Sequence, residues 1–238
     1  MSFQNNNGSR AVAIVSGGLD SCGVASYLKN KGYDLCLLTF NYGQRAKQEI
    51  KRAQEFGTFL SVKDQKIIDI SFMKELYGST NALTDEKTEM PSHFQSNIIV
   101  PIRNAVFLTI ATAYAFSIQA RLVAYGAHLT DQPYPDCRPA FAKDLATSLN
   151  LGDIDAIQSG AHPRIEIWSP AVEGLTKDEM LRISYRLLGE KVFRTWSCYL
   201  DGEKQCGVCE SCSNRRNAFE AAGIRDLTEY IEPTKKNR

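Results

Sequence analysis

Ser16-Gly17-Gly18-Leu19-Asp20-Ser21 is the stretch of sequence that decides the fold. It follows an apolar run at residues 11–15, which predicts a buried parallel strand, and it precedes a predicted helix at residues 21–30. In a strand-to-helix loop of this kind, backbone N–H groups and the helix dipole together bind anions. The two glycines let a phosphate approach the backbone closely, and the two serine hydroxyls add donors. The stretch therefore predicts a phosphate site near the start of the chain.

Asp20 is the unusual member of this loop, because a carboxylate repels a phosphate unless it holds a metal ion or orients a donor. The loop lacks the lysine of a Walker A sequence and does not follow the pattern G-x-G-x-x-G. It resembles the S-G-G-x-D-S pyrophosphate loop (PP-loop) of the ATP pyrophosphatase superfamily, whose members activate a carbonyl or carboxylate oxygen with AMP and release pyrophosphate. The resemblance implies that ATP with Mg²⁺ binds to Val15, Ser16, Gly17, Gly18, Leu19, Asp20, Ser21 and Cys22.

The composition points to a compact protein that acts on small molecules. The 238 residues allow one large domain, and the contents of hydrophobic (43%) and charged (23%) residues are ordinary. A net charge of +1 gives no basic field for nucleic acid, and no apolar run reaches membrane-spanning length. The polar start has no signal-peptide core. We therefore expect a cytoplasmic protein without membrane or direct nucleic-acid partners, and we leave a homodimer open.

Strands and helices alternate five times along the chain. Apolar runs predict strands at residues 11–15, 35–40, 65–70, 122–125 and 165–168. Helices are predicted at residues 21–30, 44–60, 103–119, 139–149 and 177–188. The last of these begins with a capping box formed by Thr176 and Glu179. The alternation predicts an α/β, Rossmann-like fold (of the adenine nucleotide alpha hydrolase type), with a parallel five-stranded sheet and helices on both faces.

We expect four parts along the chain: a disordered tail (1–10), the ATP-binding α/β domain (11–190), a zinc-binding segment packed on that domain (191–224) and a C-terminal tail (225–238). Residues 76–97 interrupt the domain without any clear periodicity. A loop of that length inside a compact domain is usually functional, so it predicts a lid or substrate loop. A disordered insertion is the alternative.

Two arginines follow features that place them near the phosphate site. Arg45 follows the second strand, at the edge of the sheet where ligands bind in open α/β proteins. Arg103 and Asn104 begin a helix that is apolar on all sides and is therefore expected to be buried. Burying them is costly unless they face a pocket. A guanidinium matches both phosphate and carboxylate, so we expect anion binding, with helix capping or a salt bridge as the alternative.

Four of the seven cysteines are clustered near the end of the chain. Cys198, Cys206, Cys209 and Cys212 follow the spacing C-x7-C-x2-C-x2-C, which lets tight turns aim four thiolates at one tetrahedral metal ion. The odd count and the absence of an export signal favour a reducing compartment over disulfides. An iron–sulfur cluster is the competing metal site. We expect one structural zinc ion per chain with no open position for catalysis.

Together these residues resemble the 7-cyano-7-deazaguanine synthase (QueC) family over residues 11–223. The matching stretches are residues 16–21, 41–45 (Asn-Tyr-Gly-Gln-Arg), 82–84 (Ala-Leu-Thr), 100–104 without residue 102, 134–138 (Tyr-Pro-Asp-Cys-Arg) and the four cysteines. The resemblance implies an ATP-dependent ligase in the synthesis of queuosine and archaeosine precursors. Such an enzyme converts 7-carboxy-7-deazaguanine and ammonia into the nitrile through an adenylated carboxylate and an adenylated amide.

The resemblance also implies roles for individual residues. Asp20, Arg45 and Arg103 are the catalytic candidates, and the two arginines neutralise phosphate or the substrate carboxylate. Asp131 and Asp136 accept hydrogen bonds from the N–H edge of a guanine-like base. The implied substrate site consists of Tyr42, Gln44, Arg103, Asn104, Asp131, Tyr134, Asp136 and Arg138.

The chain departs from the family pattern in two places. Ala46 stands where the family usually has a histidine. If that histidine handles protons or contacts the ligand, this chain either lacks the group or supplies it from elsewhere, with His128 and His93 as candidates. Asp131-Gln132-Pro133 replaces a stretch that often contains Ser and Gly. These departures keep a second hypothesis open: the same adenylation chemistry on a deazaguanine destined for DNA, a tRNA base or a protein terminus. A non-enzymatic, zinc-stapled nucleotide-binding module is a third, which the intact Asp20 and Arg103 disfavour.

Overall fold

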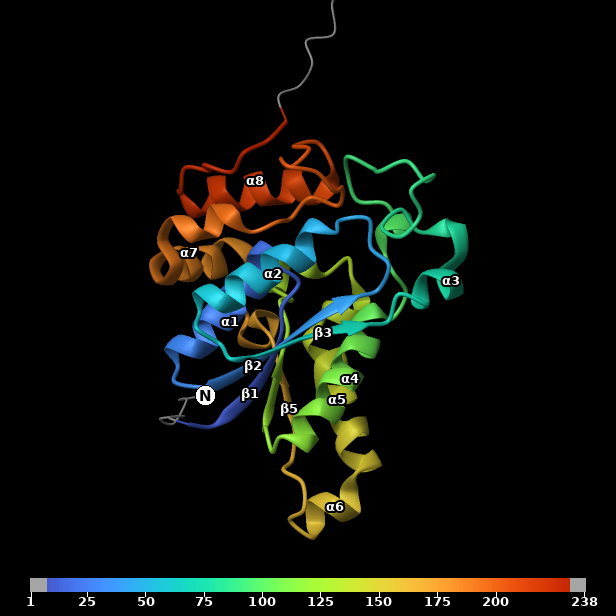
Figure 1. Ribbon diagram of the computed structural model, residues 1–238, viewed down its shortest axis with the longest axis vertical. Coiled ribbons are helices and arrows are strands. Elements are labelled where there is room, and N and C mark those ends of the chain that lie inside the picture. The colour runs from blue at the N-terminus through green and yellow to red at the C-terminus, as the bar shows by residue number, and fades with distance from the viewer. Residues whose placement is uncertain (1–7, 232–238) are drawn as a thin grey trace, which may run out of the picture.

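The computed structural model describes residues 8–231 and is organised around a parallel sheet (Figure 1). Its strands follow the order β3-β2-β1-β4-β5, so the first strand is central, and every neighbouring pair is parallel. The predicted α/β fold with five parallel strands is confirmed. The strands are β1 (Arg10–Ile14), β2 (Asp34–Asn41), β3 (Asp64–Asp69), β4 (Leu122–Ala124) and β5 (Glu166–Trp168).

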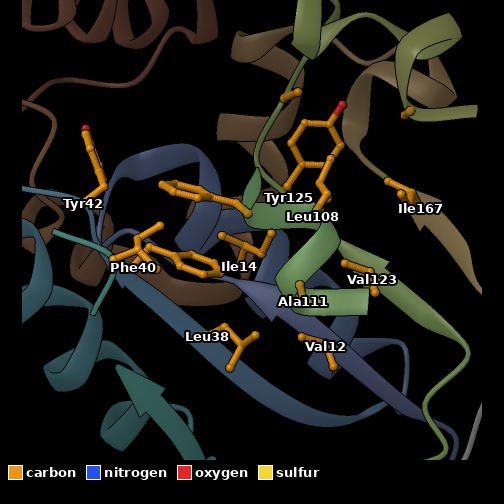
Figure 2. Packing of buried hydrophobic residues seen from close by; sticks show 14 of the residues in the cluster. Val12, Ile14, Leu38, Phe40, Tyr42, Leu108, Ala111, Val123, Tyr125 and Ile167 are labelled. Carbon is orange, nitrogen blue, oxygen red and sulfur yellow. The ribbon is translucent and has the colours of Figure 1, made fainter. Parts of the chain in front are cut away.

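One face of the sheet is covered by α4 (Arg103–Ser117) and α5 (Pro139–Gly152). Because side chains alternate along a strand, Val12 and Ile14 of β1 point to this face. Figure 2 shows Val12 near Ala111 of α4, within a cluster that also contains Leu108 of α4 and Leu38 of β2. The predicted covering of this face by helices is confirmed.

The other face of the sheet receives the alternate residues of β1, Ala11 and Ala13. It is covered by α1 (Leu19–Asn30), α2 (Gln48–Phe59) and α7 (Lys177–Leu188), and α8 (Glu210–Ala222) packs on α7 (Figure 1). The capping box predicted at the start of α7 is present, because Thr176 N–H donates to the Glu179 carboxylate at 2.9 Å.

Two predicted helix starts differ from the structure. The first helix begins at Leu19 instead of residue 21, since Gly18 is extended and serves as its N-cap. The second begins at Gln48 instead of residue 44. Gln44 folds back on the chain, where its side chain accepts from Tyr42 N–H and donates to the Phe40 carbonyl, which holds the start of this segment out of the helix.

Several short helices were not predicted. They are α3 (Met73–Tyr77), α6 (Ile154–Gln158) and the 3-10 turns Gly78–Thr80, Ser96–Ile98, Leu129–Asp131, Pro135–Cys137, Pro170–Glu173 and Gly189–Arg194. The long loop predicted at 76–97 begins and ends in such turns. Its base is closed by Asn81, whose amide donates to the Ile99 carbonyl at 2.8 Å, and by a bond from Ala82 N–H to the Asn97 carbonyl.

The predicted complete burial of the 103–119 helix is wrong, because α4 is buried on one side only. Leu108 and Ala111 face the sheet, whereas Thr109 and Ala113 are exposed. Among the described residues, Ser96–Ser117 has the length and apolar composition of a membrane span. The stretch is not one continuous helix, since residues 99–102 are non-helical, and its helical part packs on β1 and β4.

The predicted tails lie mostly outside the described residues, which exclude 1–7 and 232–238. β1 already begins at Arg10, inside the predicted N-terminal tail. Residues 225–231 lie along the cysteine-containing segment: Thr228 accepts a hydrogen bond from Arg215 at 3.0 Å, and Ile231 N–H donates to the Gln205 carbonyl at 2.8 Å.

We expect Leu38→Ala to lower the free energy of unfolding by about 2–5 kcal/mol, because it leaves a cavity beside the central strand. Urea denaturation at neutral pH measures the change. Leu151→Ala, which truncates an exposed leucine of α5, is the matched control and should stay within about 0.5 kcal/mol of wild type. Equal losses in the two variants would contradict the core assignment.

Candidate active site and metal centre

A cavity of about 250 Å³ lies at the carboxyl ends of β1 and β4. The strand order reverses between these two strands, which is where open α/β sheets bind ligands. Gly126, just after β4, permits the close approach of the first turn of α1: a Cβ there would lie 2.9 Å from Ser21 N. The predicted site residues that line the cavity are Ser16, Gly18, Leu19, Asp20, Ser21, Tyr42, Arg103, Asn104, Asp131, Tyr134 and Asp136.

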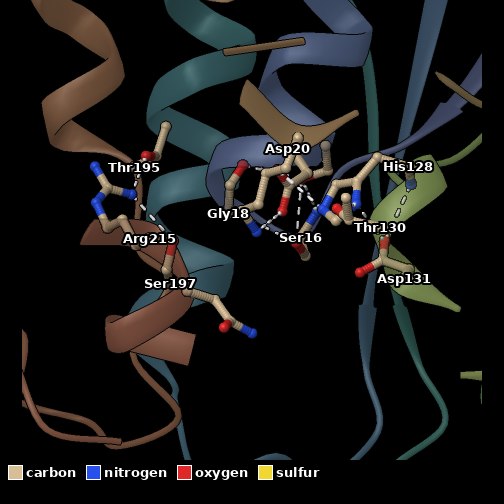
Figure 3. Close-up of polar contacts among 12 residues, drawn as sticks. Ser16, Gly18, Asp20, His128, Thr130, Asp131, Thr195, Ser197 and Arg215 are labelled. Carbon is tan, nitrogen blue, oxygen red and sulfur yellow. Dashed lines mark hydrogen bonds and ion pairs between the residues drawn. The ribbon is translucent and has the colours of Figure 1, made fainter. Parts of the chain in front are cut away.

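The Ser16–Ser21 loop forms one wall of this cavity (Figure 3). Its two serine hydroxyls lie 3.1 Å apart, and the Ser21 hydroxyl accepts from Ser16 N–H at 3.1 Å. Gly17 has a φ of +87°, and a Cβ at this position would lie 2.2 Å from the Glu49 carbonyl. Only glycine fits there, so the loop is pressed against the first turn of α2.

Asp20 is held by two basic side chains. Its carboxylate accepts a hydrogen bond from Lys177 Nζ at 2.8 Å, and His128 Nε2 lies 3.8 Å away. Burial alone would raise the pKa of Asp20, but the charge and the hydrogen bond of Lys177 oppose it, and the pKa lies below its usual value. The Asp20 carboxylate in turn keeps the pKa of Lys177 above its usual value, although burial acts to lower that pKa. Asp20 is therefore ionised and fixed in position.

His128 and Asp131 form a second polar group next to this pair (Figure 3). The Asp131 carboxylate accepts from His128 N–H at 3.0 Å, and His128 Nδ1 lies 2.8 Å from the Thr130 hydroxyl. Burial lowers the pKa of His128 to about 4, so the imidazole is neutral at pH 7. Burial also raises the pKa of Asp131 to about 7, against the opposing charge of Lys177.

Arg103 also lines the cavity, where a different set of charges surrounds it. Its guanidinium donates to the Tyr42 hydroxyl at 3.0 Å and lies 6.0 Å from the centre of the Phe107 ring. Burial acts to lower its pKa, but Tyr42, Asp136 and Glu49 raise it above the usual value, so the charge is retained. Such a half-buried, permanently charged fork is suited to a planar anion.

Asp136 is fixed at the start of α4. Its carboxylate accepts from both the backbone N–H of Asn104 at 3.0 Å and the Asn104 amide at 3.2 Å. Tyr134 lines the same part of the cavity, and Phe94 of the long loop meets its ring edge-on at 5.5 Å. Leu83 of that loop also lines the cavity, so the loop covers one side of it.

Arg45, Gln44 and Arg138 lie outside the cavity lining. The Arg45 guanidinium donates to three loop carbonyls, those of Ala82, Asp85 and Thr88, at 2.9–3.3 Å. The structure thus places Arg45 where it holds the long loop rather than an anion. Arg138 donates twice to the carbonyl of residue 132, and Gln44 bonds to backbone atoms. In the loop, Val15, Gly17 and Cys22 likewise do not line the cavity.

The four clustered cysteines meet in space at the start of α8. Their sulfur atoms lie within 4.8 Å of one another, with Cys206 and Cys212 at 3.9 Å and Cys198 and Cys209 at 4.0 Å. Four thiolates at about 2.3 Å from a tetrahedral ion are about 3.8 Å apart, so these sulfur atoms can hold one metal ion. All seven cysteines of the chain are free of disulfide bonds.

The cysteine segment also forms part of the cavity wall, through Trp196, Ser197, Tyr199, Glu210, Ser211 and Asn214. Arg215 of α8 is fully buried and donates to the hydroxyls of Thr195 at 2.8 Å and Ser197 at 3.0 Å (Figure 3). Between them, Trp196 N–H donates to the Gly17 carbonyl at 2.8 Å. The cysteine segment therefore contacts the Ser16–Ser21 loop directly.

Comparison with known proteins identifies the family. The family described as "Queuosine biosynthesis protein QueC" matches residues 10–223. A 7-cyano-7-deazaguanine synthase of Caldicellulosiruptor saccharolyticus is 39% identical over 93% of this chain and 95% of its own length. Synthases of the same name from Oceanobacillus iheyensis and Thermoplasma acidophilum are 36% and 37% identical, over 94% and 93% of this chain and 99% and 92% of their own lengths.

The chain belongs to the QueC family. This confirms the family predicted from the residues.

Three charged residues that line this cavity were not singled out from the sequence, namely Lys177, Glu49 and Glu210, the last of which is the first residue of α8. Lys177 is the first residue of α7, after β5, so its place at the ligand-binding edge follows from the strand order. Glu49 lies in the first turn of α2. The capping box at Thr176 was the available clue to Lys177, because it fixes where that helix begins. The contacts of His128 with Asp20 and Asp131 were also missed, since nothing in sequence brings the three together.

We expect Lys177→Met to lower the free energy of unfolding by about 1–3 kcal/mol at pH 7, because Asp20 loses its main partner while only 27% exposed. With Lys177 present, the pKa of Asp20 is lower in the folded than in the unfolded chain. The ion pair therefore stabilises the fold at pH values above the usual Asp pKa. This stabilisation is lost as the pH falls through the pKa that Asp20 has in the folded chain. The deficit of the variant should therefore shrink below about pH 4.

Urea denaturation at pH 7 and at pH 3 measures the effect. Lys204→Met removes an exposed ion pair with Glu229 and should change the stability by less than about 0.5 kcal/mol. A deficit of Lys177→Met that stays constant across this pH range would contradict the assigned coupling to Asp20.

Proposed function

We infer that this chain, like the relatives it matches, is a 7-cyano-7-deazaguanine synthase: an ATP-dependent ligase that converts 7-carboxy-7-deazaguanine and ammonia into the nitrile. The observation that carries the inference is that the pyrophosphate loop and the Arg103 group face one cavity, in a chain 35–39% identical to synthases of that name over more than nine-tenths of its length. The reaction belongs to queuosine biosynthesis, as the family description states.

ATP is proposed to bind along the Ser16–Ser21 loop. The loop N–H groups and the two serine hydroxyls donate to phosphate oxygens, while Val15, Gly17 and Cys22 support the loop from behind. Mg²⁺ would be held by the Asp20 carboxylate, and Lys177 supplies a positive charge beside it. Mg²⁺ supplies neutralisation of the phosphate charge when it is bound.

The deazaguanine is proposed to bind across the cavity from this loop. Arg103 meets its carboxylate, since a guanidinium forks onto two oxygens. Asp131 and Asp136 accept hydrogen bonds from the N–H edge of the base, and the rings of Tyr42 and Tyr134 lie in the same wall. Asn104 orients Asp136, as both of its bonds to that carboxylate indicate.

The chemistry needs mainly positioning and charge neutralisation. The substrate carboxylate attacks the α-phosphate, pyrophosphate leaves, and ammonia displaces AMP to give an amide. A second ATP activates the amide oxygen, and loss of AMP gives the nitrile. Arg45, Gln44 and Arg138 are proposed to act by holding the loops around the site, because their side chains bond to backbone atoms outside the cavity.

The four cysteines are proposed to hold one structural zinc ion. Their spacing, the sulfur separations and the backbone N–H groups that donate to Cys198 and Cys206 sulfur all suit a tetrahedral thiolate site. With four protein ligands no position remains for substrate, so the ion stabilises the segment that contacts Gly17.

We further propose that the enzyme works in the cytoplasm on small molecules, without membrane or nucleic-acid partners. The disulfide-free cysteines and the net charge of +1 support this proposal. A homodimer stays a prediction.

Incubation with 7-carboxy-7-deazaguanine, ammonium and Mg-ATP, followed by mass spectrometry, tests the function. We expect the nitrile, with AMP and pyrophosphate. ATP cleavage that depends on a different acceptor, with no nitrile formed, would favour the alternative acceptors. No ATP cleavage with any of them would contradict a ligase.

We expect Arg103→Ala to lower kcat/KM for the deazaguanine by about 100-fold or more, because the anion loses its partner in a half-buried site. Arg103→Lys keeps the charge but not the fork and should recover part of the activity. Arg186→Ala, on the exposed side of α7, is the control and should leave kcat/KM unchanged. Wild-type activity in Arg103→Ala would remove the assigned role.

We expect Cys206→Ser to lower the zinc content from one ion per chain towards zero and to weaken ATP binding, since the cysteine segment supports Gly17. Atomic emission on the purified protein and titration with ATP measure the two effects. Cys36→Ser, in β2 and away from the cluster, should keep its zinc. Full zinc occupancy in Cys206→Ser, or iron in place of zinc in wild type, would contradict the proposed site.

A further inference from the structure

Glu49 and Glu210 are the carboxylates of the cavity lining that the roles above leave unused. Glu210 already accepts hydrogen bonds from the Tyr199 hydroxyl at 2.8 Å and the Asn214 amide at 2.6 Å, which leaves Glu49 as the candidate. It lies in the first turn of α2, where its backbone carbonyl abuts Gly17 of the phosphate loop. The side chain lines the cavity together with Ser16 and Gly18 of that loop and with Arg103 of α4. Glu49 thus stands between the wall proposed for phosphate and the guanidinium proposed for the substrate carboxylate, which is where the reacting carbon has to lie.

The groups that act on Glu49 come from two other parts of the chain, α4 and the segment just after β2. Arg103 of α4 and Tyr42 of that segment interact with it electrostatically, and the Gln44 side chain also stabilises its charged form. Burial raises its pKa to about 8, and Arg103 and Gln44 reduce the shift without abolishing it. A carboxyl with a pKa near the working pH is suited to accept and release a proton during turnover.

The proposed reaction requires such a group. The nitrogen that enters as ammonia ends in a nitrile without hydrogen, so each of its three protons has to leave. Ala46, directly after Arg45, offers no group that could accept a proton. Neither histidine considered as a substitute lines the cavity: His93 is exposed in the long loop, and His128 is buried against Asp20 and Asp131.

We propose that Glu49 is a catalytic general base that removes protons from the reacting nitrogen. This inference rests on the proposed function. Asp131 is less suited to the role, because His128 N–H already donates to its carboxylate and it belongs to the group around Asp20.

The step balances in both halves of the reaction. When ammonia adds to the carbonyl carbon of the acyl adenylate, a C–N bond forms, the C–O bond to AMP breaks, and AMP leaves with the bonding pair. Glu49 takes one proton from the nitrogen and becomes a neutral carboxyl. In the second half, the amide oxygen attacks the α-phosphate and pyrophosphate leaves, which gives an imidate nitrogen with two protons. Glu49 takes the first of them, and it then takes the last N–H proton as the C–O bond breaks to give the nitrile and AMP. Each time the proton then passes to solvent.

The test uses the full-length, zinc-loaded enzyme and starts from the amide, 7-amido-7-deazaguanine, with Mg-ATP. Ammonia does not enter this half-reaction, so its own titration does not distort the pH profile. In wild type, we expect the rate of nitrile formation to rise with pH through an apparent pKa near 8, as the carboxyl loses its proton. Glu49→Gln should form the nitrile about 100-fold more slowly or slower still, and its rate should not show this rise with pH. Glu49→Asp, which keeps a carboxylate, should recover part of the rate and its rise with pH.

A second measurement separates the base from a phosphate-binding or structural role. With 7-carboxy-7-deazaguanine and no ammonia, adenylation requires no proton acceptor, so Glu49→Gln should release a burst of pyrophosphate equal to that of wild type. Glu55→Gln, an exposed glutamate of the same helix paired with Arg52, is the matched control and should behave as wild type in both assays.

Nitrile formation by Glu49→Gln within about twofold of the wild-type rate, or with the same rise of the rate with pH, overturns the role of Glu49. The proposed function is not affected by that result. A lost pyrophosphate burst in Glu49→Gln also overturns the role of Glu49, because the residue then serves adenylation. A wild-type protein that forms no nitrile removes the proposed function, and this inference with it.

Discussion

The active site depends on the space at Gly17, where no side chain fits. A Cβ at this residue would lie 2.2 Å from the Glu49 carbonyl and 2.8 Å from the Ala53 nitrogen, so α2 packs directly on the phosphate loop. The Gly17 carbonyl, in turn, accepts the N–H of Trp196 from the cysteine segment. Three distant parts of the chain therefore meet at one backbone position, and each contributes a wall to the same cavity. A side chain here would move all three walls at once.

The charges of the cavity form two groups. Asp20 interacts with Lys177 and His128, and Arg103 interacts with Asp136 and with Glu49, whose backbone abuts Gly17. Each cation already has an anionic neighbour in the protein alone, which holds both side chains in place before substrates arrive. Because these side chains are already oriented, little free energy is needed to reorient them during the reaction.

The sequence was sufficient for the fold and for most of the site, because the alternation of apolar runs and the loop at Ser16–Ser21 are local patterns. The sequence did not predict the contacts of side chains whose hydrogen-bond partners are distant in the chain. The Arg45 guanidinium bonds to loop carbonyls about forty residues away, and no periodicity reveals such a choice. Glu49 and Lys177 look like ordinary charged residues in the first turn of a helix. Their importance depends on which strand ends are neighbours in the sheet.

The hydrogen bond between Gly17 and Trp196 has a consequence for the order in which the protein matures. A ribosome releases the phosphate loop early and the cysteine segment almost last. Until residues 195–215 have emerged, the Gly17 carbonyl lacks its partner and the cavity lacks a wall, although the strand and helix on either side of the loop are already available. The cavity is therefore complete only once residues 195–215 have folded against the loop, so a nascent polypeptide that ends before them lacks one of its walls.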